Sequence, residues 1–222
     1  MIDLTHDLSQ KMPAWDGECG FRHKNKFDYE ECNSTVKFRA QKVTMDAGIG
    51  THIDAPSHCI PGAKTVGQIP LESLLAPLIV IDTHKKMTEN YQISEHDIEN
   101  FEEQYGEIPK NSFVAFYTGW SQHWHNPEKY RNNLVFPSIN EAVANILVDR
   151  NVNGIGIDTL SPDTPISNFP VHRIILGANK YIIENINNLE RMPVIGAYVL
   201  ALPMKGPELT EAPVRMIGLI SR

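Results

Sequence analysis

Two histidines and an aspartate lie close together in one glycine-rich segment, Gly48-Ile49-Gly50-Thr51-His52-Ile53-Asp54-Ala55-Pro56-Ser57-His58-Cys59. If the chain is extended up to Asp54, side chains two residues apart point to the same face, which puts His52 beside Asp54. An imidazole and a carboxylate on one face are suitable ligands for a zinc- or manganese-like ion. The same two groups could also form an ordinary hydrogen-bonded pair, and the residue types alone leave both interpretations open.

The residues around this pair favour a metal site. Gly48 and Gly50 fall on the same face of an extended segment and leave room for an ion or a ligand. Pro56 turns the chain, which could return His58 to the same place. An imidazole with a pKa near neutrality can act there as a general base. Cys59 is a further, weaker candidate donor.

A second pair of candidate ligands lies far downstream. His172 falls in the first turn of a short helix predicted from Pro170 to Gly177. Glu184 ends a short apolar strand. Taken alone, the two residues are more typical of a helix start and of a solvated strand end than of a metal site.

Buried strands alternate along the chain with helices that carry start signals. Ser94 and Asp97 resemble a capping box for a helix that stops at Gly106, and Ser138 with Glu141 forms a full one. Continuous apolar runs indicate strands covered on both faces, and further β segments flank them. These patterns predict one mixed α/β domain over residues 1–222 with a mixed sheet. The expected strands are Leu78–Ile81, Phe113–Phe116, Ile155–Ile157, Val36–Met45, Ala197–Leu202 and Val214–Ile220.

Composition and charge exclude several classes of protein. The 222 residues carry 20 basic and 27 acidic side chains, a net charge of −7, which does not favour binding to nucleic acid or to an anionic membrane. No apolar run is long enough to span a bilayer, and the first residues lack the pattern of a secretory signal. Three cysteines at irregular spacing fit reduced thiols in a cytoplasmic protein better than a disulfide framework.

Several of these motifs together resemble the cyclase family. The resemblance runs along most of the chain, and its central motif is long and mixed in residue type. The matching stretches are D-L-T-H-D-L-S (Asp3–Ser9), M-P-A-W (Met12–Trp15), G-T-H-I-D-A-P-S-H (Gly50–His58), G-I-D-T (Gly156–Thr159), H-R-I-I-L (His172–Leu176) and I-I-E-N (Ile182–Asn185).

The resemblance implies a swivelling β/β/α fold and a metal-dependent hydrolase. The family motif H-x-G-T-H-x-D-x-P-x-H supplies metal ligands from its first two histidines and its aspartate, and its last histidine is the catalytic base. In this chain the resemblance therefore assigns His58 as the base. It assigns His52, Asp54, His172 and Glu184 as ligands of Zn²⁺ or Mn²⁺, with room for two ions where Asp54 bridges them.

One position departs from the motif: its first histidine falls on Gly48, which has no donor atom. Three outcomes are possible. The site holds a single ion, Cys59 or Asp46 substitutes as a ligand, or the metal is lost in a non-catalytic relative. We favour a single ion, because His52, Asp54, His172 and Glu184 with a water complete a zinc- or manganese-like shell.

The resemblance predicts cleavage of a carbon–nitrogen bond in a small amide, either an arylformamide or a cyclic amide. The alternatives are a lactone hydrolase and a degenerate relative that binds a small molecule without turnover. Trp15 and Trp120 are candidates for an apolar wall that contacts a flat substrate. The resemblance also suggests a homodimer or higher homo-oligomer.

Overall fold

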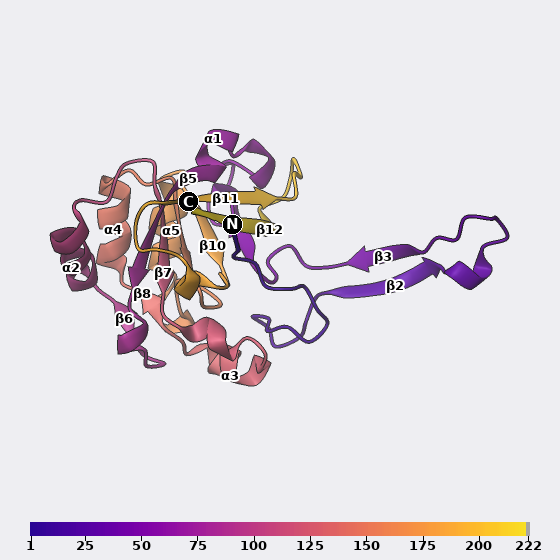
Figure 1. Ribbon diagram of the computed structural model, residues 1–222. Coiled ribbons are helices and arrows are strands. Elements are labelled where there is room, and N and C mark those ends of the chain that lie inside the picture. The colour runs from indigo at the N-terminus through magenta and orange to yellow at the C-terminus, as the bar shows by residue number, and fades with distance from the viewer. Residues whose placement is uncertain (221–222) are drawn as a thin grey trace.

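The computed structural model describes residues 1–220, which are organised around one mixed sheet (Figure 1). Its strands are β1 (Ile2–Asp3), β4 (His52–Asp54), β5 (Leu75–Asp82), β7 (Phe113–Tyr117), β9 (Gly154–Ile157), β10 (Tyr181–Glu184), β11 (Ala197–Pro203) and β12 (Glu211–Ile220). They follow the order β1-β12-β11-β5-β7-β9-β10-β4, and β4 pairs again with β12, so seven strands close into a ring. Strands β5, β7, β9 and β10 are parallel, and the other pairings are antiparallel. The expected mixed α/β fold is confirmed.

The parallel strands separate two hydrophobic cores. On β5, Leu78 and Val80 belong to a core that includes Ile53 of β4, whereas Ile79 and Ile81 belong to a second core that includes residues of the helices. This alternation follows from the two-residue period of a strand. It explains why the parallel strands have continuous apolar sequences, because both of their faces are covered.

Helices cover the face of the sheet opposite to the enclosed core. They are α2 (Glu95–Tyr105), α4 (Glu141–Asp149) and α5 (Pro170–Gly177). Helix α1 (Leu71–Leu74) instead contributes Leu74 to the enclosed core, and α3 (Pro127–Arg131) contributes Tyr130 to a third cluster. The predicted start and stop of α2 are confirmed, since Ser94 and Asp97 form a capping box and Gly106 ends the helix at φ 88°. Helix α5 has the predicted bounds and places His172 in its first turn.

The predicted capping box at Ser138 is wrong. Ser138 and Ile139 form the short strand β8, which pairs with β6 (Gln92–Ile93). Asn140 caps α4 instead, because its side chain accepts a hydrogen bond from the Ala142 amide. An asparagine at this position is as good a cap as a serine, and the strand pairing takes Ser138 out of the helix.

The glycine-rich segment is extended over fewer residues than expected. Only His52–Asp54 forms a strand, and the chain bends before it, with Gly50 at φ +60°. The positive φ favours glycine there, and a β-carbon on Gly50 would also lie 2.5 Å from the end of the Leu8 side chain, which would have to shift. Strand β4 therefore begins directly at His52, between β10 and β12.

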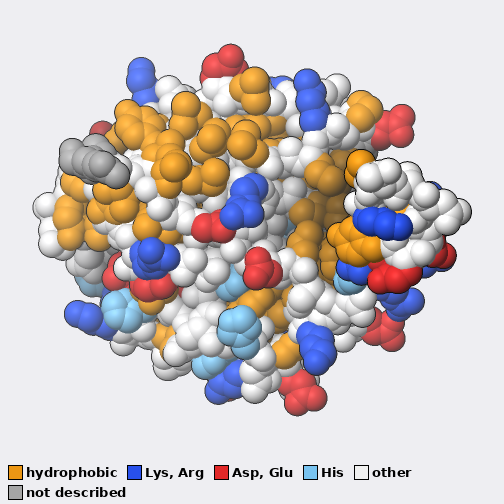
Figure 2. Space-filling view, turned by 45° about the vertical axis from the view of Figure 1, so that its right-hand side comes forward, with side chains coloured by type: hydrophobic (Ala, Val, Ile, Leu, Met, Phe, Trp, Pro, Cys, Tyr) orange, Lys and Arg blue, Asp and Glu red, His pale blue; other side chains and the backbone are white. Residues whose placement is uncertain are grey.

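Strands β2 (Arg22–Phe27) and β3 (Ala40–Thr44) form a separate antiparallel hairpin that projects from the body, as Figure 1 shows. We call residues 22–44 the arm. Almost every residue of its two strands is exposed, including Val43, and so are Val36 and Phe38 before β3. Figure 2 shows the arm at the right, in front of the body, with hydrophobic side chains exposed beside it.

None of the helices within residues 1–220 is both long enough and apolar enough to cross a membrane.

Candidate metal centre

The side chains of His52, Asp54 and Glu184 meet at the junction of β4 and β10. His52 and Asp54 occupy alternate positions of β4, and Glu184 lies opposite His52 in the register of the two strands. The Nε2 atom of His52 is 3.5 Å from Oδ1 of Asp54 and 3.4 Å from Oε2 of Glu184. All three side chains are almost completely buried. The structure thus brings together residues that are 130 positions apart in the sequence.

His172 of α5 faces the same point from the helix side of the sheet. Its Nε2 atom lies 3.8 Å from Oδ2 of Asp54 and 3.5 Å from Oε1 of Glu184. The four residues assigned as ligands by the family resemblance therefore form one buried cluster. The histidine–carboxylate distances of 3.4 to 3.8 Å are close to the distance of about 3.4 Å expected between two ligands bonded tetrahedrally at about 2.1 Å to one ion.

Both histidines direct Nε2 toward the carboxylates of the cluster. The Nδ1 atom of His52 lies 2.9 Å from the Gly50 carbonyl oxygen, and that of His172 lies 2.8 Å from Oδ2 of Asp163. In its neutral form, a histidine that donates its Nδ1 hydrogen to such an acceptor carries a lone pair on Nε2, which is the arrangement common in protein metal sites. The hydrogen bonds thus fix both ring orientation and tautomer.

The charges of the cluster fit a bound cation. Burial and the neighbouring Glu184 carboxylate together raise the pKa of Asp54 to about 6, because two buried carboxylates repel each other. Burial alone lowers the pKa of His52, but the facing Asp54 and Glu184 carboxylates more than offset it, so the net shift is upward. Oδ1 of Asp54 is buried and has no hydrogen-bond partner among the described residues. Two imidazole nitrogens and two carboxylates, one of which has the unsatisfied oxygen, form a donor set suited to Zn²⁺ or Mn²⁺.

His58 lies at the rim of the cluster. Pro56 begins a short 3₁₀ helix that ends at His58, so the predicted turn of the chain is present. The His58 ring centroid is 6.0 Å from that of His172, and its Nδ1 atom is 3.3 Å from Oε2 of Glu211. The interaction with Glu211 raises the pKa of His58 in spite of its partial burial. About a third of the His58 side chain is exposed, so it can reach a bound molecule.

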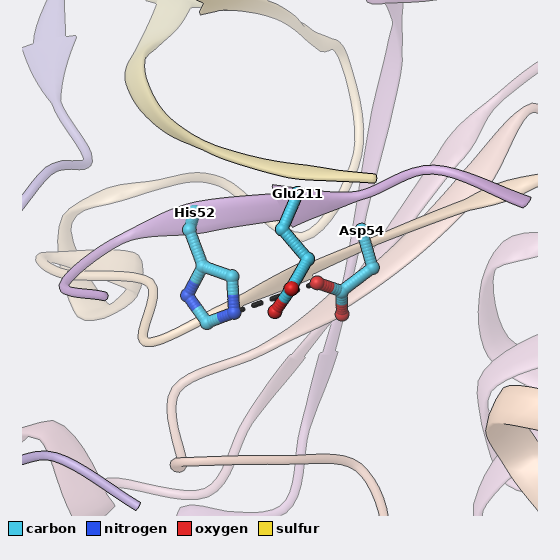
Figure 3. A group of neighbouring side chains, drawn as sticks. All are labelled: His52, Asp54 and Glu211. Atoms are coloured by element: carbon cyan, nitrogen blue, oxygen red, sulfur yellow. Dashed lines mark ion pairs between the residues drawn. The ribbon is translucent and has the colours of Figure 1, made fainter. Parts of the chain in front are cut away.

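Glu211 is a member of this site that the sequence analysis missed. It is the first residue of β12, and Figure 3 shows its carboxylate between the side chains of His52 and Asp54. Ligand atoms of these three residues lie within 4.8 Å of one another, as do those of Asp54, His172 and Glu184. Asp46 and Cys59, the substitutes considered for the missing histidine, belong to neither group. A pairing between residues 54 and 211 leaves no local signal in the sequence.

A cavity of about 600 Å³ opens above these side chains, which is a suitable size for a small organic molecule. Trp15 and Phe169 line it on the apolar side, with their ring centroids 6.0 Å apart. Trp120, the other tryptophan expected to contact substrate, is not part of this lining. It is buried in another cluster, where its indole nitrogen donates a hydrogen bond of 2.8 Å to the Tyr130 carbonyl.

Comparison with known proteins agrees with this geometry. Residues 2–164 match the model of a family described as "Putative cyclase", which covers most of the chain and includes the motif at Gly50–His58. The chain belongs to the cyclase family. Among its relatives in that family, the kynurenine formamidase of Polaromonas naphthalenivorans is 26% identical over 219 residues, which covers 97% of this chain and 88% of the relative.

Solved structures of cyclase-like proteins share the fold. Isatin hydrolase A from Ralstonia solanacearum superposes with a TM-score of 0.91 and 27% identity, covering 99% of this chain and 91% of that one. A protein described as a potential metal-dependent hydrolase with cyclase activity superposes with a TM-score of 0.79 and 26% identity, covering 100% and 98%. The cyclase fold implied by the sequence resemblance is confirmed.

Proposed function

We propose that this cyclase-family protein is a metal-dependent hydrolase that cleaves the carbon–nitrogen bond of a small aromatic amide. One observation carries the proposal: the Nε2 atoms of His52 and His172 both lie against the carboxylates of Asp54 and Glu184, in one buried cluster that lines a cavity. These four residues would hold the cation. The names of the relatives, which are hydrolases, support the reaction class.

A divalent ion such as Zn²⁺ or Mn²⁺, when bound, supplies Lewis-acid activation of a water molecule and of the substrate carbonyl. The remaining steps belong to side chains. His58, paired through Nδ1 with Glu211, keeps Nε2 free to remove the proton from the attacking water. As the carbon–nitrogen bond breaks, the same nitrogen returns that proton to the leaving amine. The Glu211 carboxylate stabilises the imidazolium that forms between these two transfers.

The cavity supports an aromatic substrate. Trp15, Phe169, Ile49 and Leu160 give one side of it an apolar surface, against which a flat ring can pack. The candidate ligands and His58 line the same cavity, and the Phe169 ring centroid lies 5.9 Å from that of His172. The relatives include a kynurenine formamidase and an isatin hydrolase, so an arylformamide and a cyclic amide are the substrates we propose first.

The experiment combines metal analysis with hydrolysis of three substrate classes. The purified protein is stripped with a chelator, reloaded with Zn²⁺ or Mn²⁺, and assayed with a formanilide, an isatin and an aromatic lactone. We expect metal-dependent turnover of the formanilide or the isatin. Full activity in the metal-free protein contradicts the proposal. Turnover of the lactone alone identifies the alternative esterase, and less than about a tenth of an ion per chain after reloading identifies a non-catalytic relative.

We also infer that the protein is a homo-oligomer in which the arm docks on the body of a second copy. Two exposed strands of this kind are only marginally stable in water without further packing. The arm has six basic and three acidic side chains, so it carries +3 while the other residues carry −10. Lys24 and Lys42 lie directly opposite each other in the hairpin, and this repulsion favours an acidic partner surface.

A further inference from the structure

The space beside Gly48 is filled by the side chain of Glu211. A β-carbon built on Gly48 would overlap Oε1 of Glu211, and it would lie 3.5 Å from Nε2 of His52. Any side chain at position 48 would therefore point at the ligand nitrogen of His52 and occupy the place that the Glu211 carboxylate takes. Gly48 itself does not have a positive φ, so the backbone does not require glycine at this position. A side chain at this position would instead displace the Glu211 carboxylate from its present place.

The position of Glu211 follows from the pairing of β12 with β4. Glu211 lies opposite Asp54, and Pro213 lies opposite His52. Side chains of directly opposed residues in an antiparallel pair lie on the same face of the sheet, so Glu211 projects to the same side as Asp54. About a quarter of the Glu211 side chain is exposed, and the Asp54 side chain is almost completely buried.

Two carboxylates directly opposite each other repel, and oxygens of this pair lie within 4.8 Å of each other, with Asp54 buried and Glu211 partly exposed. The Oδ1 atom of Asp54, which belongs to this group, is buried and has no hydrogen-bond partner among the described residues. His52 approaches that atom only to 3.5 Å, which is too long for a hydrogen bond but close to the separation of two ligands on one ion. Figure 3 shows the three side chains directed at a common point.

We propose that Glu211 is a metal ligand that replaces the donor absent at Gly48. It binds a cation together with His52 and Oδ1 of Asp54. A second cation position is formed by Asp54, His172 and Glu184, so Asp54 bridges the two. This inference rests on the proposed metal-dependent function, and it replaces the expectation of a single ion with two ions per chain.

Glu211 also contacts His58, through the 3.3 Å between Oε2 and Nδ1, and this contact alone would make it only a positioning residue. The two roles differ in what they require. A ligand is needed for metal content, whereas a partner of His58 is needed only for turnover. The experiment therefore measures metal stoichiometry and affinity, which a positioning role does not change.

The experiment uses the intact protein and four variants. Glu211→Ala removes the carboxylate, and Gly48→His in that background supplies an imidazole in the vacated space. Gly48→His alone retains Glu211 and creates the overlap described above. Asp46→Ala is the matched control, because Asp46 lines the same cavity but belongs to neither candidate ligand group. Each protein is stripped, titrated calorimetrically with Zn²⁺ or Mn²⁺, and analysed for bound metal and for thermal unfolding.

We expect about two ions per chain in the wild type and in Asp46→Ala, about one in Glu211→Ala, and about two again in the double variant. Gly48→His alone is expected to unfold at a lower temperature than the double variant. If Glu211→Ala binds two ions with unchanged affinity, the inference is overturned and the proposed function stands. The same conclusion follows if the wild type binds a single ion. A wild type that binds no metal overturns the proposed function itself.

Discussion

The Nδ1 atom of His172 lies 2.8 Å from Oδ2 of Asp163, and the same oxygen accepts a hydrogen bond of 2.9 Å from the His172 amide. Asp163 is completely buried and lies nine residues before the histidine that it orients. It thereby directs the His172 Nε2 lone pair toward Asp54 and Glu184. Asp163 is a positioning residue for the proposed metal centre.

Asp163→Asn is predicted to weaken metal binding about 10- to 100-fold, because the amide no longer stabilises the required orientation and tautomer of His172. Calorimetric titration of the stripped protein with Zn²⁺ measures the effect. The matched control is Asp82→Asn, since Asp82 contacts Nδ1 of His84 in a similar pair that is exposed and away from the site. Equal affinities of the two variants would contradict the positioning role.

His58→Gln is predicted to reduce kcat by about 10²- to 10⁴-fold while the metal content stays at the wild-type level, because His58 transfers protons and is not a ligand. His52→Ala and Asp54→Ala are predicted to lose both activity and metal. Metal analysis and the hydrolysis assay are performed on the same samples. A His58→Gln protein that loses its metal would show that the residue is a ligand instead.

The stability of the protein is predicted to fall as the pH decreases below 6.5, in part because of His6. Burial, with a smaller contribution from the charge of His125, lowers the pKa of His6 from 6.5 to about 3. Between these pH values the unfolded chain binds a proton at His6 that the folded chain does not bind, so acid favours unfolding. The contribution is at most about 5 kcal/mol, reached only below the folded-state pKa.

His6→Phe tests this prediction, because a phenyl ring can keep the stacking on Trp124, whose centroid is 3.9 Å from the His6 ring. Denaturant unfolding of both chelated proteins is measured from pH 7 to pH 4. We expect a shallower pH dependence in the variant. Parallel curves would mean that the pKa of His6 is close to its ordinary value in the folded protein.

The arm is predicted to hold the oligomer together. Lys24→Glu combined with Lys42→Glu replaces the opposed lysines by glutamates, which an acidic body would repel. Light scattering after size exclusion is expected to show an oligomer for the wild type and smaller species for this variant. Lys110→Glu is the control, because Lys110 is an exposed lysine outside the arm. A monomeric wild type at micromolar concentrations would contradict the proposal.

Local patterns in the sequence predicted the scaffold of the site well. Strand β10 ends at Glu184, α5 begins at Pro170 and His52 shares a face with Asp54, each as its spacing indicated. Periodicity and capping depend on neighbours within a few residues, so a single sequence contains them.

Features that depend on distant pairing could not be predicted in this way. Glu211 enters the site only because β12 returns to β4 after some 150 residues, and nothing around Glu211 marks it as a candidate ligand. Trp120 follows a strand end, where ligand sites are common, but its indole is buried in a cluster and donates a hydrogen bond to the Tyr130 carbonyl. Both outcomes follow from tertiary contacts.

Strand β4 is only three residues long, yet it joins β10 to β12 and thereby completes the ring. Three residue pairs with β10 and three with β12 are a weak closure for a barrel. The proposed ligands Glu184 and Glu211 lie on the two strands that flank β4. A cation bound there would link β4, in the first quarter of the polypeptide, to β12, its last strand. Loss of the ion would then let the pairings of β4 open locally before the rest of the molecule unfolds. The supply of metal would then set not only the rate of turnover but also the lifetime of the protein against proteolysis.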